Sequence, residues 1–485
     1  MSQQWQQRYA SKLQPAAAAV RRIGRGDRVF IGSGCGEPQA LVAAMVEAAN
    51  AMADTELIHV CTLGVAPYAD PRYAPNFRPN AFFIGNSLRD AVNQVRADYT
   101  PVFMSQVPEL FRSGQVPLDV ALITVSPPDE HGFVSLGVSV DITRAAVEAA
   151  KLVIAQVNRY MPHTLGDSIL HVDDIDILVE HHEPLLEWPQ EQPEEVYHKI
   201  AAHIARLIPD GATLQLGVGR IPDAVTMALE DHNDLGIHTG MFSNGVMRLA
   251  KKGVINGRRK TLHNGKIIGS FALGTQELFQ WLDNNKSVEL HPSDYTNNPA
   301  VICRNDNMIS VNAALEVDLT GQVVADSLGQ RFYTGLGGHA DFIRGAAMAR
   351  NGKAIIALPS IDMTPEGPRS RIVATLSEGA DVVASRGDAY YVVTEYGVAY
   401  LHGRSLRERA MSLISIAHPD FRSQLLHAAK RRHLVYPDQI MPPASKPYPA
   451  QYEETMMLAD GTTLLVRPIR PDDEPRMKDM FYSFS

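Results

Sequence analysis

The chain has 485 residues, 45% of them apolar and 20% charged, which is enough for two or three domains of ordinary globular composition. Its 45 basic and 54 acidic residues give a net charge of −9, which argues against a protein that coats nucleic acid or an anionic membrane surface. No run approaches the roughly 20 apolar residues of a spanning helix, and the N-terminus lacks an apolar signal core, so we expect a cytoplasmic protein.

The first half of the chain alternates between strand-like and helix-like segments. Strands are expected at 27–31, 56–61, 120–125, 133–140 and 152–157, and helices at 5–22, 39–52 and 142–151. The strands are continuous apolar runs rather than alternating ones. This pattern is typical of a parallel sheet that is buried on both faces, and hence of an α/β fold.

The second half repeats this plan. The same pattern of a strand, a Gly-x-Gly turn, a proline and then a helix is predicted around Arg28 to Pro38 and around Thr213 to Pro222. The segments 135–146 and 335–346 agree at five of twelve positions without a gap, and apolar strands at 152–155 and 354–357 follow them. We therefore predict two tandem, duplicated α/β domains with parallel-rich sheets, at 1–190 and 191–435, with a ligand in the cleft between them.

After these domains, the sequence predicts a Pro-rich linker at 436–459 and a further strand and helix at 460–485. A strand and part of a helix cannot bury a core. We interpret this tail as an appendage or as the start of a cut domain.

The turn at 217–222, GVGRIP, lies between an apolar strand at 213–216 and a helix expected at 223–230. A glycine turn here lets backbone N–H groups approach a phosphate at the positive end of a helix. The alternative is that two glycines are needed only because the turn is tight. This motif alone does not separate the two readings.

Taken together, the motifs resemble the acetyl-CoA hydrolase/transferase family, which includes 4-hydroxybutyrate, butyrate and acetate CoA-transferases. The resemblance covers nearly all of residues 6–430. The segments that carry it are SGCGEPQ (33–39), SPPDEHGFVSLGVSVD (126–141), MPHTLGDSILHVDDID (161–176), GVGRIPDAV (217–225), LGIHT (235–239), HPSDYTNNP (291–299), NAALEVDLTGQV (312–323), GLGGHADFIRGA (335–346) and TEYGVAYLHG (394–403). The tail from Gly461 resembles the opening of a GNAT-type N-acetyltransferase domain.

The resemblance implies a covalent, ping-pong mechanism. A glutamate attacks an acyl-CoA thioester to form an anhydride, CoA returns to give a glutamyl-CoA thioester, and a carboxylate such as acetate accepts CoA. The implied CoA contacts fall on Gly217, Val218, Gly219, Arg220, Ile221, Leu315 and Gly338. Gly337 and Gly338 are the implied oxyanion donors. The expected partners are a short-chain acyl-CoA, a small carboxylate and further copies of the chain in a homodimer or larger homo-oligomer.

The chain departs from the family at the nucleophile. Relatives read LGIHTE or LGIHSE, but here Gly240 stands at the glutamate position, and Asn244 replaces a nearby aspartate. Another departure is His339, where relatives usually carry Gln or Asn. Glycine cannot form an anhydride, so we expect transferase activity to be impaired or absent. Three explanations stay open: a degenerated member, altered chemistry with water as the attacking group, or an introduced change.

Other residues could substitute for the missing glutamate or form additional sites. Glu37, Asp341 and Glu395 are carboxylates that could replace the glutamate, but roles in turns or helix caps are the expected ones. The 17 histidines show no HxxH spacing and the three cysteines no CxxC spacing, so we predict no metal site. The alternatives to transfer are a non-catalytic acyl-CoA-binding protein and a slow thioester hydrolase.

Overall fold

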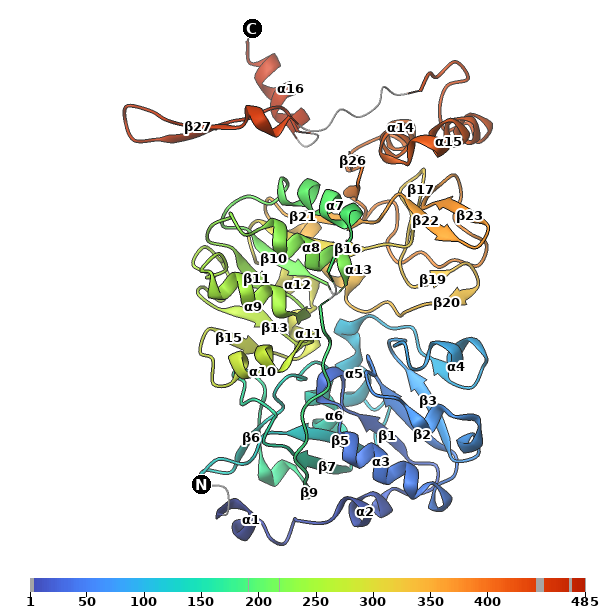
Figure 1. Ribbon diagram of the computed structural model, residues 1–485, viewed down its shortest axis with the longest axis vertical. Helices are drawn as coiled ribbons and strands as arrows, with labels where there is room; N and C mark the ends of the chain where they lie inside the picture. Colours follow the sequence, from blue (N-terminus) through green and yellow to red (C-terminus); the bar gives the residue numbers. More distant parts are fainter. Residues whose placement is uncertain (1–3, 191, 218, 442–448, 471–472, 485) are drawn as a thin grey trace.

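In the computed structural model, two α/β halves lie one above the other, and the C-terminal tail projects from the far end of the second half (Figure 1). The structure describes residues 4–190, 192–217, 219–441, 449–470 and 473–484. The first half is blue to teal and the second is green to orange in Figure 1.

The first half contains a seven-stranded sheet in which every neighbouring pair is parallel. Its strands, in spatial order, are β4 (Asp98–Tyr99), β3 (Phe77–Ala81), β2 (Thr55–His59), β1 (Arg28–Ile31), β5 (Val120–Val125), β7 (Leu152–Val157) and β9 (Ile177–Glu180). The helices of this half are α1 (Gln4–Arg8), α2 (Ala16–Ala19), α3 (Gln39–Glu47), α4 (Arg89–Asn93), α5 (Val107–Arg112) and α6 (Thr143–Ala149).

The second half contains an eight-stranded sheet that is parallel except for its last strand. Its strands, in spatial order, are β15 (Val288–Leu290), β13 (Ile267–Gly269), β11 (Gly236–His238), β10 (Thr213–Leu216), β16 (Met308–Ala313), β21 (Lys353–Ala357), β25 (Tyr391–Thr394) and β26 (Gly397–Tyr400). Its helices are α7 (Glu195–Ala205), α8 (Arg220–Ala228), α9 (Asn244–Lys251), α10 (Gln276–Leu282), α11 (Ser293–Thr296), α12 (Pro299–Ile302), α13 (His339–Met348), α14 (Leu406–Ile416) and α15 (Pro419–Arg431).

The two sheets have corresponding strand orders. In each, the strand before the Gly-x-Gly turn, β1 or β10, lies between the next strand of the chain and a strand that follows later, β5 or β16. The predicted α/β fold with parallel-rich sheets is confirmed. The exact domain limits stay a prediction.

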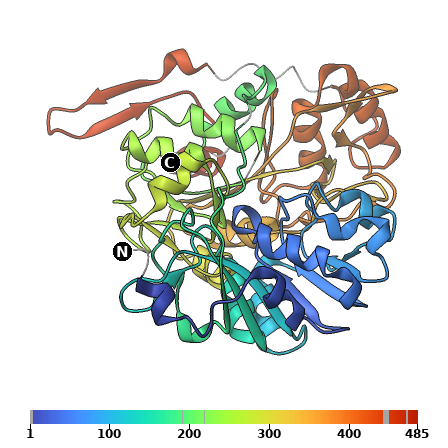
Figure 2. The same cartoon turned by 60° about the horizontal axis from the view of Figure 1, so that its bottom comes forward.

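One apolar core joins the halves. Buried side chains of the first sheet, such as Ile58 and Val125, belong to the same cluster as Leu214 and Ile309 of the second. Backbone bonds reinforce this junction, because Val140 N–H donates to the Ser270 carbonyl at 3.1 Å. Figure 2 shows the two halves in close apposition from a second direction. The junction is therefore a packed interior in which a site can be held rigidly.

The predicted helix over 5–22 is wrong as a single element. It divides into α1 and α2, and Gln14 N–H between them donates to the Leu178 carbonyl at 2.9 Å. Pro15 precedes α2 and has no N–H for an interior helical bond. Conversely, the helix predicted from residue 223 begins earlier, at Arg220. Pro222 is tolerated there because first-turn N–H groups have no intrahelical partner.

The tail also differs from its prediction. Strand β27 (Glu454–Met457) lies inside the predicted linker and pairs with β28 (Thr463–Val466) in an antiparallel hairpin, and α16 (Glu474–Tyr482) follows. Both strands are exposed throughout. Linker residues 442–448 lie outside the described residues. The described tail forms secondary structure without a buried core of its own.

Candidate active site

The candidate site begins where β10 ends. Gly217 follows Leu216, and Gly219 has φ +104°, a conformation that L side chains rarely adopt. This turn reverses the chain into α8, whose first residue is Arg220. The sequence thus supplies glycine where the backbone requires it. Val218 lies outside the described residues.

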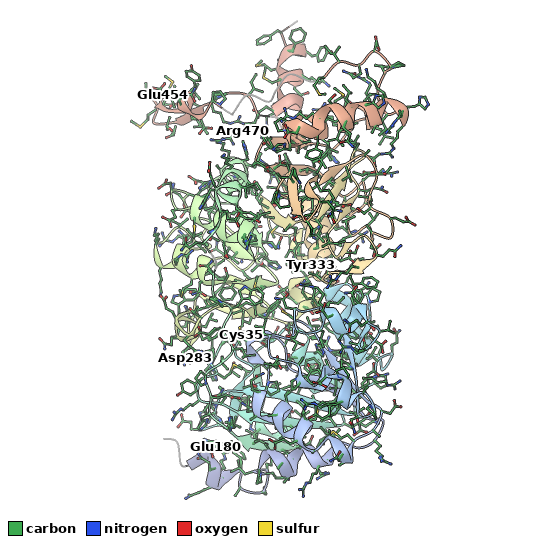
Figure 3. The ribbon with its side chains drawn as sticks, turned by 45° about the vertical axis from the view of Figure 1, so that its right-hand side comes forward. Cys35, Glu180, Asp283, Tyr333, Glu454 and Arg470 are labelled. Carbon is green, nitrogen blue, oxygen red and sulfur yellow. The ribbon has the colours of Figure 1, made fainter. Side chains whose placement is uncertain are left out.

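An outer pocket of about 710 Å³ opens beside this turn. Four of the residues predicted to bind CoA line it: Gly219, Arg220, Ile221 and Leu315. Tyr333 lies on its other side, and Figure 3 shows Tyr333 at the boundary between the two halves. Arg220 Nη1 donates to Glu194 Oε1 at 3.1 Å. The arrangement offers a helix N-terminus and cations to an elongated anionic ligand.

An inner pocket of about 310 Å³ contains the remaining predicted residues, Gly217, Gly240, Gly337 and Gly338. Ala313, at the end of β16, lines both pockets and makes them neighbours. Most inner lining residues are apolar, for example Phe83 and Met104. Segments from both halves of the chain are therefore brought together at one junction.

Gly240 follows β11 at the edge of the inner pocket. Its carbonyl accepts from Ser270 N–H at 2.9 Å and from Phe271 N–H at 3.1 Å, and its φ lies outside the left-handed region. A Cβ built here would meet Asn297 Oδ1 at 3.1 Å, so a small shift of that amide makes room for a side chain. The backbone at residue 240 does not require glycine.

Gly338 differs from Gly240 in this respect. A Cβ at Gly338 would lie 2.4 Å from Asn297 Nδ2, closer than any packed structure allows. The few tenths of an ångström that a side chain at residue 240 needs are not enough here, and a larger movement of Asn297 is opposed because it is buried and Thr296 Oγ1 donates to its Oδ1 at 3.1 Å. The preceding Gly337 has φ +54°, and its carbonyl accepts from Met104 N–H at 3.2 Å. Both positions require glycine for reasons of space or conformation.

Comparisons with known proteins show the family of this chain. Residues 1–187 match the acetyl-CoA hydrolase/transferase N-terminal domain and residues 274–429 match the C-terminal domain. The chain is 49% identical over 429 residues to the 4-hydroxybutyrate coenzyme A transferase of Clostridium kluyveri, covering 88% of this chain and 100% of that protein. The chain belongs to the acetyl-CoA hydrolase/transferase family.

Solved structures agree with this assignment. The 4-hydroxybutyrate CoA-transferase of Porphyromonas gingivalis superposes with a TM-score of 0.76 at 40% identity, covering 88% of this chain and 100% of that one. RipA from Yersinia pestis superposes with a TM-score of 0.84 at 36% identity, covering 88% and 99%. The chain is thus a member of an enzyme family whose relatives act on CoA thioesters.

Within this family fold, the second departure from the motif, Asn244, does not line either pocket. Its Nδ2 donates to Thr275 Oγ1 at 2.7 Å, and its Oδ1 accepts from Thr275 N–H at 3.0 Å. An aspartate could accept both bonds, because the threonine hydroxyl can donate instead. Asn244 therefore joins α9 to the start of α10, and it removes no carboxylate from the pocket.

The three carboxylates considered as substitutes are all engaged elsewhere. Glu37 accepts from Gly64 N–H at 2.9 Å, Glu395 accepts from Ser360 Oγ at 2.5 Å, and Asp341 accepts from Ser105 Oγ at 2.8 Å. None of them is among the described residues that line the inner pocket, and that lining contains no Asp or Glu. Each of these bonds joins segments that are far apart in the chain, so they are tertiary contacts and not the turn or helix-cap contacts expected from the sequence.

The buried carboxyl group of Asp341, which bonds Ser105 of the first half, is expected to make the stability of the protein depend on pH. Burial raises its pKa from 3.8 to about 6. The folded state then holds a proton that the unfolded state has lost, so the free energy of unfolding declines as pH rises from about 4 to about 6. Asp341→Asn should remove this decline. Between pH about 4 and pH about 6, the free energy of unfolding of the variant should therefore rise by about 3 kcal/mol relative to that of the wild type. Urea unfolding at both pH values measures it, and parallel pH profiles for the two proteins would contradict the assignment.

The sequence did not single out Cys61, which lines the inner pocket just after β2. Its φ of +41° is a strained conformation for a non-glycine residue. Burial raises the pKa of its thiol to about 12, so the thiol is neutral and weakly nucleophilic at pH 7. The available signal was its position after a parallel strand, at the sheet edge where ligands bind.

His339 also lines the inner pocket, at the first position of α13. Burial lowers the pKa of its imidazole to about 4, and its Nε2 has no hydrogen-bond partner among the described residues. Gln215 and Asn312, on adjacent strands, pair with each other in the same pocket at 3.1 Å. At neutral pH the described inner pocket therefore presents amides, an imidazole and a thiol, all uncharged.

Proposed function

We propose that this chain binds a short-chain acyl-CoA, with the CoA arm in the outer pocket and the thioester in the inner pocket. The supporting observation is that the two pockets adjoin at Ala313, with the glycine turn and Leu315 in one and Gly240 in the other. The pantetheine chain would pass this point, and the phosphates would lie near Gly219 and Arg220. The small apolar inner pocket suits a short acyl chain.

The proposed ancestral reaction transfers CoA from that thioester to a small carboxylate through a glutamyl-CoA intermediate. Gly337 and Gly338 would donate backbone N–H groups to the oxyanion. In this chain the attacking carboxylate is missing at Gly240, so we propose that transfer is lost while acyl-CoA binding persists. The names of relatives support the substrate class. One of them is the succinyl-CoA:acetate/propanoyl-CoA:succinate CoA transferase of Fasciola hepatica, 44% identical over 420 residues.

Slow hydrolysis of the thioester is the second candidate, and the vacant space beside Gly240 could admit water. The pocket offers little activation for that water, because the pKa of His339 is about 4 and the pKa of Cys61 is about 12. Binding without turnover is therefore the function that the geometry favours. Release of free thiol from acetyl-CoA without added carboxylate distinguishes the two.

Other proposals rest on the family resemblance. Relatives act on acyl-CoA and carboxylate substrates, and we propose the same partners and a homo-oligomeric, cytoplasmic protein. No helix in the described part of the chain is long and apolar enough to cross a membrane. The likeness of the tail to a GNAT domain gains no support from the two family matches, which end at residue 429.

Binding can be tested without catalysis by protecting Cys61 from alkylation. At alkaline pH, where a larger fraction of this weakly acidic thiol is ionised, saturating acetyl-CoA should slow modification of Cys61 by iodoacetamide at least about 10-fold, because the ligand covers the inner pocket while it is bound. Cys303 is partly exposed, lies outside both pockets and serves as the internal control. Peptide mass spectrometry follows both thiols. Equal rates at Cys61 with and without acetyl-CoA would contradict the proposal.

A further inference from the structure

We propose that His263, Glu289 and His291 form a zinc-binding site at the outer edge of the second sheet. His263 lies in the loop before β13, Glu289 lies in the edge strand β15, and His291 follows that strand directly. Alternate residues of a strand point to the same side, so Glu289 and His291 project together toward the loop that carries His263. The site is separate from both pockets.

The facing atoms have the spacing of metal ligands. One oxygen of Glu289, Oε2, lies 3.5 Å from His291 Nε2 and 3.8 Å from His263 Nδ1. The ligand atoms of the three residues all lie within 4.8 Å of one another. A tetrahedral zinc ion with bonds of 2.0–2.1 Å needs ligand atoms about 3.4 Å apart. A small inward movement of the His263 ring would complete this geometry.

The far side of each ligand is already held by a partner. His291 Nδ1 lies 2.7 Å from Asp167 Oδ2, and His263 Nε2 lies 2.6 Å from Tyr295 Oη. Lys266 Nζ lies 2.9 Å from Glu289 Oε1, the oxygen directed away from both histidines. With these partners, each imidazole can donate its outer N–H and direct its lone pair inward. Such outer partners orient the ligands of zinc sites.

An independent observation also indicates a missing ligand. His291 Nε2 is buried and has no hydrogen-bond partner within the described parts of the chain, although Nδ1 of the same ring is engaged by Asp167. Burial of an unpaired nitrogen is costly unless a ligand satisfies it. The side chains of Glu289 and His263 remain 22% and 24% exposed, so an ion can enter from solvent.

The donor set selects the ion. Two imidazoles and one carboxylate suit zinc, with water in a fourth position, whereas magnesium and calcium prefer sites built from oxygen alone. Bound zinc would fix the loop around His263 to the edge strand. Asp167 extends this link to the first half of the chain, because its N–H also donates to the Leu290 carbonyl at 2.9 Å. The site would therefore stabilise the junction of the halves.

The test uses the full chain without a histidine tag, stripped with a chelator and dialysed against buffered zinc. Elemental analysis should find roughly one zinc per chain in the wild type, and zinc should raise its melting temperature. Glu289→Gln and His263→Gln should each weaken zinc binding at least about 10-fold and abolish the melting shift. His131→Gln is the matched control, because His131 lies 3.5 Å from Glu130 without a third ligand.

The site is overturned by a wild type that retains no zinc at micromolar free metal, or by ligand variants that bind zinc as tightly as the wild type. Because the wild-type stoichiometry is measured first, a variant that fails to fold does not remove the test. An effect in His131→Gln equal to that in Glu289→Gln would also contradict the assignment, since it would indicate nonspecific binding to surface histidines.

Discussion

Gly240→Glu is expected to raise the rate of CoA transfer from acetyl-CoA to butyrate by about 10³-fold or more, because it supplies the missing nucleophile. The atoms nearest to a Cβ at this position belong to the Asn297 amide, at 3.1 Å, and the Phe342 ring, at 3.4 Å, so a shift of a few tenths of an ångström accommodates the side chain. Gly337 and Gly338, the proposed oxyanion donors, line the same pocket as Gly240. Butyryl-CoA formation, followed by chromatography, measures the rate.

Gly240→Gln is the matched control for this substitution. It fills the same space but cannot form an anhydride, so its rate should stay at the wild-type level. Addition of Asn244→Asp to Gly240→Glu should change the rate by less than about 3-fold, since Asn244 contacts Thr275 outside the pocket. Equal activity of the Gln and Glu variants would show that the family chemistry has not been restored.

Gly338→Ala, introduced into the Gly240→Glu background, is expected to lower the restored rate by about 10²- to 10³-fold, the usual cost of a lost oxyanion donor. A methyl group here would lie 2.4 Å from Asn297 Nδ2. Either Asn297 or the turn must move, and both line the inner pocket. The loss should appear mainly in kcat, because the oxyanion forms only during reaction.

Gly217→Ala, introduced into the same Gly240→Glu background, is the control for the steric effect of adding a methyl group at Gly338. Gly217 also lines the inner pocket, but a Cβ there meets only Pro222 Cγ, at 3.8 Å. Because the added methyl group displaces neither Asn297 nor the turn, we expect at most about a 3-fold loss. If Gly217→Ala lost as much rate as Gly338→Ala, crowding at Asn297 would not explain the effect.

Much of the fold could be predicted from the sequence, because the patterns that indicate buried strands lie within short segments of the chain. Continuous apolar runs predicted β5, β7 and β10 with their observed limits. The repeat between the halves predicted two corresponding sheets. The break between α1 and α2 was not predicted, because it depends on the hydrogen bond from Gln14 N–H to the Leu178 carbonyl. Strand β27 was not predicted either, because it lies in a segment that we interpreted as a linker and forms only by pairing with β28. Those features depend on tertiary contacts.

The site was predictable in part. The glycine turns and Gly240 were found by motif, and the structure places all the described ones in two adjoining pockets. The role of Asn244 could not be predicted from its spacing to Gly240, because its side chain is directed toward Thr275 by the packing of α9 against the start of α10. Cys61 and the His263–Glu289–His291 cluster were missed because their residues meet only after the strands assemble. Spacing rules such as HxxH describe ligands on one helix and not ligands that come from an edge strand and a separate loop.

The central claim is that this member of the family binds acyl-CoA but lacks the covalent route for transfer. The most direct measurement incubates the unaltered chain with acetyl-CoA and butyrate, and follows butyryl-CoA and free thiol side by side. We predict that neither product forms above the rate without protein, while acetyl-CoA still protects Cys61. Butyryl-CoA formation within about 10-fold of the Gly240→Glu variant would contradict the account, because it would require a nucleophile other than the missing glutamate.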